Sequence, residues 1–380
     1  MKTRDKYIYK HLNNKIKMTS IGLMSGTSMD GVDVSCIVTD GNNYFHQIFF
    51  ASYKYTSKIK KLINQFFINK NNYIEVCNQI TLFHIKSIKM AAKLNNYPLS
   101  KVDIIGFHGQ TLLHKPEECW TWQIGNGKML SNSLNIPVIS NFRYRDICLG
   151  GEGAPLASLW HKTLLNSLSN KSYPCIFINI GGVSNMTYIN EFKDVKYCFD
   201  IGPGNGPIDL LVNKYFNLDM DYGGKKALSG KIYLDIISKI LKFKWFNKLP
   251  PKSLDKNELN SYIMSCVEGI SPVDKLATLS RLVSVTLKKH TDLLNINPKY
   301  IYISGGGAHN KAIMNGIREE FNNNNTKFMN LNDWDIDAIE AQAFAYLAVR
   351  SYKGLPLTEN NVTGIKIDVS GGLLNFPNVK

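Results

Sequence analysis

The spacing of hydrophobic positions along the chain predicts strands and helices in mixed order. Polar and apolar residues alternate from Val32 to Val38, which is the period of a half-buried strand. Residues 56–67 instead carry apolar side chains three and four positions apart, and 73–95 does the same, so both ranges predict amphipathic helices. Short, mainly apolar segments predict buried strands at 102–107, 175–180 and 300–304.

A strand, a glycine-rich turn and a second strand occur in both halves of the chain. The strand at 19–24 runs into SGTSMDG (25–31), and CIFINI (175–180) runs through Gly181-Gly182 into VSNMTYI (183–189). Strand-to-helix crossovers follow each unit. A chain of 380 residues also exceeds the size at which one hydrophobic core stops growing. These features predict two α/β lobes.

The lobe boundaries can be placed from the same patterns. Lobe I is expected to comprise residues 18–145 with about 335–380, and lobe II residues 146–334. Residues 1–17 are basic and lack the apolar run of a secretory signal, so a disordered extension is expected there. The segment GGEGAP (150–155) is the expected hinge, because glycine adopts backbone angles that other residues disfavour.

Composition narrows the class of protein. The net charge of +15 comes with scattered lysines and no arginine-rich stripe, which favours a solvated surface over a nucleic-acid face. Seven cysteines without a CxxC pair argue against a disulfide framework or a zinc site and suit a reducing cytoplasm. No apolar run reaches the roughly 20 residues of a membrane span. We therefore expect a cytoplasmic protein that binds neither nucleic acid nor membrane and has no metal site of its own.

Four glycine-rich turns follow predicted strands, and they are the first candidate site. Bound phosphates need unshielded backbone N–H groups, which glycine exposes best. The hydroxyls of Ser25, Thr27 and Ser28 could add donors. Ordinary tight turns are the alternative for any one of them, but four in two lobes favour a bound nucleotide. None is a Walker A loop. The four are SGTSMDG (25–31), IGGVSN (180–185), DIGPGNG (200–206) and SGGGAHN (304–310).

Three aspartates are candidates for chemistry near these turns. Asp200 ends a predicted strand, where a carboxylate can face a cleft and accept a proton from a nucleophile. A turn aspartate is its alternative interpretation. Asp30 and Asp33 flank the first turn, and either could hold a water of a Mg²⁺ shell, or Asp30-Gly31 could be a simple hairpin turn.

Candidate substrate contacts are less specific. His108 and Gln110 end a strand and could bind hydroxyls, although a lone histidine there is more often structural. Arg143 and Arg145 could pair with a carboxylate or form surface ion pairs. Glu340 shares an apolar helix face but could also complete a capping box with Asp337.

Eight segments together resemble the anhydro-N-acetylmuramic acid kinase family, over residues of about 18 to 372. The combination of SGTSxDGxD, HGQT and FDxGPGN is highly specific. The sequence departs from the family at Glu152, where members usually have glutamine. The segments are IGLMSGTSMDGVD (21–33), GFHGQTLLHKP (106–116), TWQIGNG (121–127), NFRYRDICLGGEGAPL (141–156), INIGGVSNMT (178–187), FDIGPGNGPID (199–209), SGGGAHN (304–310) and EAQAFAYLAV (340–349).

The resemblance implies two RNase-H-like lobes of the actin-like ATPase kind, with ATP and substrate in a central cleft. It implies ATP with Mg²⁺ as cofactor, a sugar substrate, and Asp200 as catalytic base. A homodimer stays an open alternative to a single chain. The substrate contacts it implies are His108, Gln110, Arg145 and Glu340. The implied ATP contacts are Gly26, Thr27, Ser28, Met29, Asp30, Gly31, Val32, Asp33, Gly181, Gly182, Gly305, Gly306 and Gly307.

The reaction implied is ATP-dependent opening of 1,6-anhydro-N-acetylmuramic acid, with phosphorylation of the 6-oxygen and release of ADP. Its biological setting would be the recycling of cell-wall peptidoglycan and amino sugar catabolism. Two other functions remain open from the residues. A related kinase could phosphorylate an ordinary sugar hydroxyl, and a nucleotide-switched ATPase could bind a partner protein without turning over a sugar.

Overall fold

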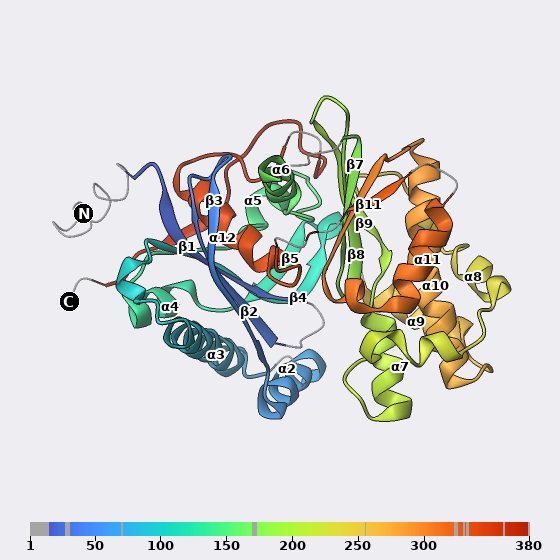
Figure 1. Cartoon of the computed structure of the whole chain (residues 1–380). Helices are drawn as coiled ribbons and strands as arrows, with labels where there is room; N and C mark the ends of the chain where they lie inside the picture. Colours follow the sequence, from blue (N-terminus) through green and yellow to red (C-terminus); the bar gives the residue numbers. More distant parts are fainter. Residues whose placement is uncertain are drawn as a thin grey trace. The chain divides into compact units, whose positions relative to one another are not determined.

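The computed structural model divides the chain into two compact units. Unit 1 comprises residues 1–169 with 338–380, and unit 2 comprises residues 170–337. Each unit is described below by itself (Figure 1). The structure describes residues 15–26, 31–69, 71–168, 173–254, 256–322, 326–329, 331, 334–359 and 362–378.

Unit 1 is built on one mixed sheet of seven strands among the described residues. The strand order is β12-β6-β4-β1-β2-β3, with β5 paired to β4. β1, β2 and β3 are antiparallel neighbours, whereas β1, β4 and β6 run parallel. The strands are β1 (Met18–Ser25), β2 (Gly31–Thr39), β3 (Phe45–Lys54), β4 (Ile104–Lys115), β5 (Trp120–Ile124), β6 (Val138–Ser140) and β12 (Leu373–Asn375).

Unit 2 repeats this arrangement with five strands in its described part. The order is β11-β10-β7-β8-β9, in which β7, β8 and β9 are antiparallel and β7, β10 and β11 run parallel. An antiparallel three-strand meander followed by two parallel strands beside the first is the RNase-H-like order. The prediction of two RNase-H-like α/β lobes is therefore confirmed. The strands are β7 (Cys175–Ile180), β8 (Val183–Ile189), β9 (Val195–Pro203), β10 (Tyr300–Ser304) and β11 (Lys327–Met329).

Helices supply the remaining layers. In unit 1 they are α2 (Ser57–Asn69), α3 (Tyr73–Leu94), α4 (Gly127–Leu134), α5 (Tyr144–Cys148), α6 (Ser158–Ser167) and α12 (Ile339–Tyr352). In unit 2 they are α7 (Gly206–Phe216), α8 (Leu234–Ile240), α9 (Lys256–Cys266), α10 (Pro272–Leu293) and α11 (Lys311–Phe321).

The helix α12 lies directly on strands β1 and β4, and two glycines allow this. A Cβ on Gly22 would lie 1.9 Å from the carbonyl oxygen of Ala341, and one on Gly106 would lie 2.1 Å from that of Phe344. The neighbours Ile21 and Leu23 point the other way and join the core formed with α3. The sheet of unit 1 thus carries a helix on each face.

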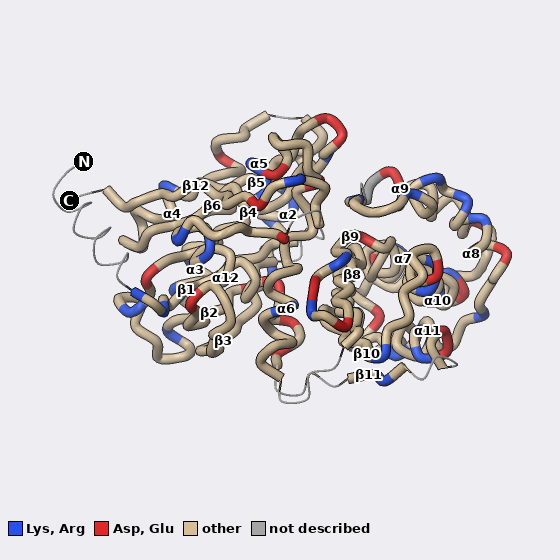
Figure 2. The backbone as a smooth tube through the Cα atoms, turned by 90° about the horizontal axis from the view of Figure 1, so that it is seen from above, with Lys and Arg blue, Asp and Glu red and all other residues tan. Residues whose placement is uncertain are grey.

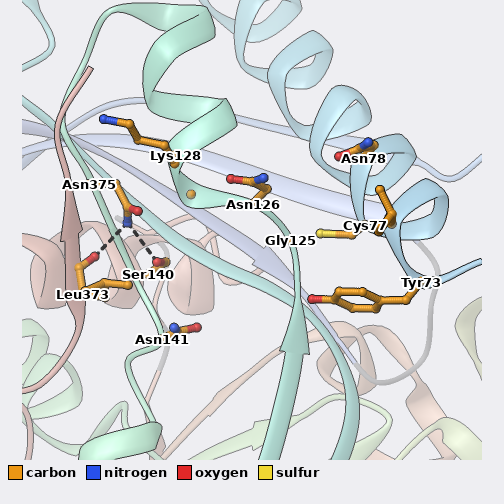
Figure 3. Close-up of a pocket in the computed structure, with 12 residues that line it drawn as sticks. Tyr73, Cys77, Asn78, Gly125, Asn126, Lys128, Ser140, Asn141, Leu373 and Asn375 are labelled. Atoms are coloured by element: carbon orange, nitrogen blue, oxygen red, sulfur yellow. Dashed lines mark hydrogen bonds between the residues drawn. The ribbon is translucent and has the colours of Figure 1, made fainter. Parts of the chain in front are cut away.

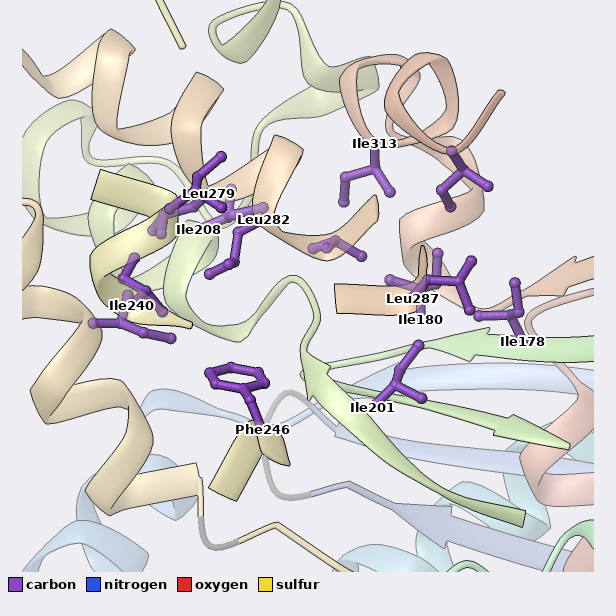
Figure 4. Close-up of a cluster of buried hydrophobic side chains, with 14 of the residues drawn as sticks. Ile178, Ile180, Ile201, Ile208, Ile240, Phe246, Leu279, Leu282, Leu287 and Ile313 are labelled. Carbon is purple, nitrogen blue, oxygen red and sulfur yellow. The ribbon is translucent and has the colours of Figure 1, made fainter. Parts of the chain in front are cut away.

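The core of unit 2 is built mainly from isoleucine and leucine. Strand residues such as Ile178 and Ile201 meet Leu282 and Leu287 of α10 (Figure 4). The predicted start of α10 is confirmed, because Ser271 accepts from the N–H of Asp274 and Pro272 opens the first turn. This core fixes the strand ends that carry the glycine-rich turns.

The expected hinge lies inside unit 1 in this structure. The buried carboxylate of Asp146 accepts from the N–H of Gly153 at 2.7 Å and from the hydroxyl of Thr363 at 2.5 Å. The N–H of Glu152 donates to the carbonyl of Thr363 at 2.7 Å. These bonds hold the segment 150–155 against residues of unit 1. The unit boundary falls after residue 169, not after residue 145.

Two local predictions also differ from the structure. Strand β3 was not predicted, because apolar and polar residues do not alternate cleanly in FHQIFFASYK. The capping box at Asp337 is absent, since α12 begins at Ile339 without a side-chain cap. The carboxylate of Asp337 instead lies 3.1 Å from Nε2 of His309.

Lysines and arginines are interspersed with acidic residues over both units in the part of the chain that is described (Figure 2). No helix among the described residues is long and apolar enough to cross a membrane.

Candidate active site

Two glycine-rich turns of unit 2 lie against each other at one sheet edge. Strands β7 and β10 are parallel neighbours, so their carboxyl ends lie together. A Cβ on Gly305, which has φ +78°, would lie 2.4 Å from Oδ1 of Asn179. One on Gly307 would lie 2.2 Å from Cγ2 of Ile180. Only glycine permits this approach, so the turn after β10 is fitted onto the end of β7.

A third turn is hydrogen-bonded to the same edge. The N–H groups of Gly204 and Gly206 donate to the carbonyl of Gly182, each at 3.1 Å, and that of Asn205 donates to Gly181 at 2.7 Å. The sequence alone did not predict this link. Because of this link, the backbone N–H groups of residues 204–206 are already hydrogen-bonded within the protein. The link also fixes the Gly181-Gly182 turn relative to strand β9.

Asp200 lies on β9 beside a bulge and is half-buried. The register shifts between Ser184 and Asn185, and Asp200 pairs with Asn185 across the bulge. Bulges commonly redirect side chains next to functional sites. The N–H of Leu254 donates to Oδ2 of Asp200 at 2.9 Å. A carboxylate held from one side by a backbone donor is oriented and can still accept a proton.

A buried lysine is bonded to Asp200 through its backbone and to a buried histidine through its side chain, and neither residue was predicted from the sequence. Lys252 is fully buried, and its carbonyl accepts from the N–H of Asp200 at 3.3 Å. Its Nζ lies 2.8 Å from Nε2 of His290. Burial lowers the pKa of Lys252 to about 7, with Lys248 opposing the charge and Asp200 favouring it. A single lysine after two prolines gives no sequence signal for this arrangement.

In unit 1, the end of β1 meets the middle of β4, because β4 continues to Lys115 and does not end at Gln110 as the sequence suggested. The hydroxyl of Ser25 donates to the carbonyl of Gly109 at 2.9 Å, and Nε2 of Gln110 donates to the carbonyl of Gly26 at 2.8 Å. Ser25, a candidate phosphate donor in the sequence, is thus bonded within the unit. Gln110 is fully buried and bonded to the start of the first glycine-rich turn.

Both ring nitrogens of His108 are engaged within unit 1. Nδ1 lies 2.8 Å from the carbonyl of Gly109, which can only accept, so Nδ1 carries the proton. Nε2 then accepts from Nε of Arg143 at 3.0 Å. Burial, followed by the positive charge of Arg143, holds the pKa of His108 well below its usual value. His108 therefore positions the turn and has no ring nitrogen open to a substrate.

The other substrate candidates lie at different depths. Arg145 is exposed on α5, and its side chain makes no hydrogen bond or ion pair with the described residues. Arg143, in contrast, also donates to the carbonyl of Gly153 at 2.8 Å. Glu340 is half-buried one helical turn before Phe344, whose ring centroid lies 4.5 Å from that of His108.

Residues of the first turn fall partly outside the described residues. Thr27, Ser28, Met29 and Asp30 lie there. Gly31 opens β2, where a Cβ would lie 2.2 Å from the carbonyl oxygen of Tyr53. The side chain of Val32 is fully buried in the core, so only its backbone can face a ligand. Asp33 is half-buried on β2.

Unit 1 also contains a pocket of about 300 Å³ that holds none of the predicted site residues. Asn126, at the start of α4, and Tyr73, at the start of α3, lie on its wall (Figure 3). Asn375 closes another side and donates to the hydroxyl of Ser140 at 3.1 Å. The charged side chain that lines the pocket is Lys128, which already donates to the carbonyl of Phe376. The pocket therefore does not locate the nucleotide.

Comparison with known proteins gives one family. Residues 18–377 match the family model described as anhydro-N-acetylmuramic acid kinase. A protein of that name from Zymomonas mobilis is 35% identical over 373 residues, covering 94% of this chain and 100% of the relative. A namesake from Rhodopseudomonas palustris strain HaA2 is 36% identical over 371 residues, covering 95% and 100%.

A solved structure shares a weaker likeness. The activator of the 2-hydroxyisocaproyl-CoA dehydratase from Clostridium difficile, with bound ADPNP, is 12% identical. It covers 88% of this chain and 96% of its own, at a TM-score of 0.48. The fold assignment rests on the strand order of the two sheets instead.

Proposed function

The chain belongs to the anhydro-N-acetylmuramic acid kinase family, whose members use ATP, and we propose that its substrate is 1,6-anhydro-N-acetylmuramic acid. The products would be N-acetylmuramic acid 6-phosphate and ADP. The observation that carries this proposal within the structure is the placement of Asp200 on a bulged strand end, with its carboxylate oriented by the N–H of Leu254.

The chemistry of the anhydro sugar explains why a base is needed. An internal ether joins the anomeric carbon to the 6-oxygen, and an ether oxygen carries no proton and is a poor nucleophile. Asp200 accepts a proton from a water molecule as that water attacks the anomeric carbon. The bond to the 6-oxygen breaks, and this oxygen takes the γ-phosphoryl group of ATP. General base catalysis of this kind contributes about 10²–10⁴-fold.

The glycine-rich turns are proposed to hold the nucleotide. Gly26, Gly31 and Asp33 border the first turn, whereas Gly181-Gly182 and Gly305–Gly307 lie together at the edge of the unit 2 sheet. The close backbone approach at the unit 2 edge suits phosphates or ribose, which only small residues admit. Asp33 is a single half-buried carboxylate, which fits Mg²⁺ held mostly by waters and phosphates. Bound there, Mg²⁺ would neutralise charge on the phosphates.

The sugar contacts are proposed from exposure and charge. Arg145 is exposed and free of partners in the described chain, so its guanidinium can bind the lactyl carboxylate of the sugar in a bidentate manner. Glu340 is half-buried and is proposed to contact hydroxyl or amide groups, whereas Gln110 is fully buried and is proposed to support the first turn through its bond to Gly26. His108 acts through Arg143 and Gly109 instead of touching the sugar.

Two further properties belong to this proposal. The enzyme works in the cytoplasm, which suits seven free cysteines. A homodimer is its proposed assembly, and sedimentation of the purified chain checks that directly.

The function is tested by measuring ADP release with Mg-ATP, with and without the anhydro sugar. Turnover that depends on the anhydro sugar and yields a 6-phosphate supports the proposal. Free N-acetylmuramic acid serves as the matched control, because it has an ordinary 6-hydroxyl. Equal turnover of both sugars would instead identify a kinase of ordinary hydroxyl groups, and sugar-independent ATP hydrolysis would identify a nucleotide switch.

A further inference from the structure

The side chain of Lys252 is unusual because it is fully buried without an anionic partner among the residues that the structure describes. Its Nζ donates to the carbonyl of Trp245 at 3.2 Å and to Nε2 of His290 at 2.8 Å. The ammonium also lies 4.1 Å from the ring centroid of Trp245. No carboxylate of a described residue lies within ion-pair distance of Nζ. Burying such a charge is costly, so its retention calls for a physical reason.

The protonation pattern around Lys252 follows from geometry. Nδ1 of His290 lies 2.8 Å from the carbonyl of Thr286, which can only accept, so Nδ1 carries the ring proton. Nε2 is then unprotonated and accepts from Lys252. Burial, followed by the charge of Lys252, lowers the pKa of His290 to about 3, so the imidazole stays neutral. Only the lysine of this pair carries charge near neutral pH.

Lys252 is linked to Asp200 through the backbone. The N–H of Asp200 donates to the carbonyl of Lys252, and the N–H of Leu254 donates to Oδ2 of Asp200. The segment Lys252–Leu254 therefore holds the strand and the carboxylate of Asp200 at once. Asp200 also favours the charged form of Lys252 electrostatically, so the two opposite charges stabilise each other.

We propose that Lys252 is a positioning residue for the reaction, holding the carboxylate of Asp200 by its backbone and keeping it ionised by its buried positive charge. This inference rests on the proposed role of Asp200 as base. Substrate binding removes water from a carboxylate and favours its protonated form, which cannot accept the proton of the attacking water. A fixed cation opposes that effect. The acceptor His290 and the ring of Trp245 hold the cation without neutralising it.

The charged groups around Lys252 set the pH at which this support is lost. Asp200 on β9 favours the ammonium, whereas Lys248 and Lys289 oppose it, and His290 is neutral. The pKa of Lys252 is lowered to about 7, chiefly by burial. The ammonium is therefore present below about pH 7 and lost above it. Its contribution to activity should be largest in mildly acidic solution.

The test compares Lys252→Met, which keeps an unbranched apolar stem of similar length, with Lys242→Met at an exposed lysine. At about pH 6, kcat of Lys252→Met should fall about 10-fold, with KM for ATP within about twofold of the wild type. The defect should shrink to within about twofold at about pH 9, where the wild type has also lost its ammonium. A deficit that is the same at every pH would overturn the proposal, because a purely structural role predicts that outcome.

A second pair of variants keeps the test informative if Lys252→Met does not fold. His290→Gln retains an acceptor for Nζ and should keep the wild-type pH profile, whereas His290→Leu removes it and should lose activity preferentially at about pH 6. Identical profiles for both would contradict the proposal. Asp200→Asn distinguishes this failure from that of the proposed function. If Asp200→Asn is inactive and the Lys252 and His290 variants follow the wild-type profile, the base stands and the role of Lys252 is refuted.

Discussion

The two sheets have the same strand order but different polar groups on their strands. In unit 1, the middle of β4, which continues to Lys115, carries a neutral His108 whose nitrogens are satisfied by Gly109 and Arg143. In unit 2, β9 carries the Asp200 carboxylate, with the buried amine of Lys252 behind it. The two units therefore share a topology but differ in the charged groups that their strands carry. We expect this difference to separate their roles. Substitutions in unit 2 should change catalysis most, whereas buried histidines of unit 1 should mainly govern stability.

The largest effect is expected from Asp200→Asn. The amide keeps the shape of the side chain but cannot take a proton from water, so kcat should fall at least about 100-fold. Sugar-dependent ADP release measures this loss. The matched control is Asp292→Asn, an exposed aspartate paired with Lys288 on α10, which should keep wild-type activity. Full activity in Asp200→Asn would move the base to another residue, with Glu340 the first to examine.

Acid should destabilise the protein through histidines whose pKa is lowered in the folded chain, and four of these lie in unit 1: the buried His84, His108 and His161 and the half-buried His114. Burial lowers the pKa of His84 to about 4 and the pKa of His114 and of His161 to about 3. It also holds the pKa of His108 well below its usual value. Below about pH 6.5 the unfolded chain binds these protons and the folded chain does not, so stability falls as the pH decreases. Each histidine adds up to about 1.4 kcal/mol per pH unit to this slope.

Urea unfolding between about pH 7 and pH 5 measures the slope, above the range where most carboxylates titrate. His114→Gln should reduce it by about one proton, whereas His46→Gln at an exposed position should not change it. A free energy of unfolding that is constant across this range would show that the histidines are not buried and neutral.

Gly305→Ala should destabilise the sheet edge of unit 2 that is proposed to bind the nucleotide. The residue has φ +78°, and a Cβ would lie 2.4 Å from Oδ1 of Asn179 and 2.8 Å from the carbonyl of Ile180. Backbone strain and the clash together should lower the free energy of unfolding by about 3 kcal/mol and weaken ATP binding. Gly269→Ala isolates the strain, because Gly269 has φ +87° and open space around its Cβ position. That control should lose only about 1 kcal/mol. Equal losses in the two thermal unfolding curves would refute the close fit.

Arg145→Ala should produce the smallest of these effects. Loss of the exposed guanidinium should raise KM for the anhydro sugar about 10-fold and leave KM for ATP unchanged, since a charge-assisted pair with the lactyl carboxylate is lost. The matched comparison uses the anhydro sugar without its lactyl group, for which wild type and variant should not differ. A similar rise in KM for both sugars would exclude the carboxylate as the partner of Arg145.

The strands and the main helices could be predicted from the sequence because their signals are local. The apolar run at 175–180 and the Ser271-Pro272 helix start both depend on adjacent residues. The alternation in β2 ends after Cys36, where the pairing with β3 shifts register, and Val38 is then half-buried. Strand β3 has no clear period, and only its pairing with β2 makes it a strand.

The site could be predicted only in part, for the same reason. Glycine-rich turns and the aspartate after a strand are visible in the sequence. Lys252 and His290 are 38 positions apart, and only the fold brings their nitrogens within 2.8 Å. His108 shows the converse case. The sequence suggested it as a substrate ligand, but both of its ring nitrogens are hydrogen-bonded inside unit 1. Tertiary contacts, not local patterns, decide both cases.

The most direct test of the proposed reaction is to run it in water enriched in oxygen-18 and to locate the label in the product. We expect one heavy oxygen on the anomeric carbon of N-acetylmuramic acid 6-phosphate and none in the phosphate group, because water attacks the sugar and the 6-oxygen captures the phosphoryl group. Product incubated alone in the same water corrects for exchange at the anomeric carbon. Label in the phosphate group, or none at the anomeric carbon beyond exchange, would contradict the account.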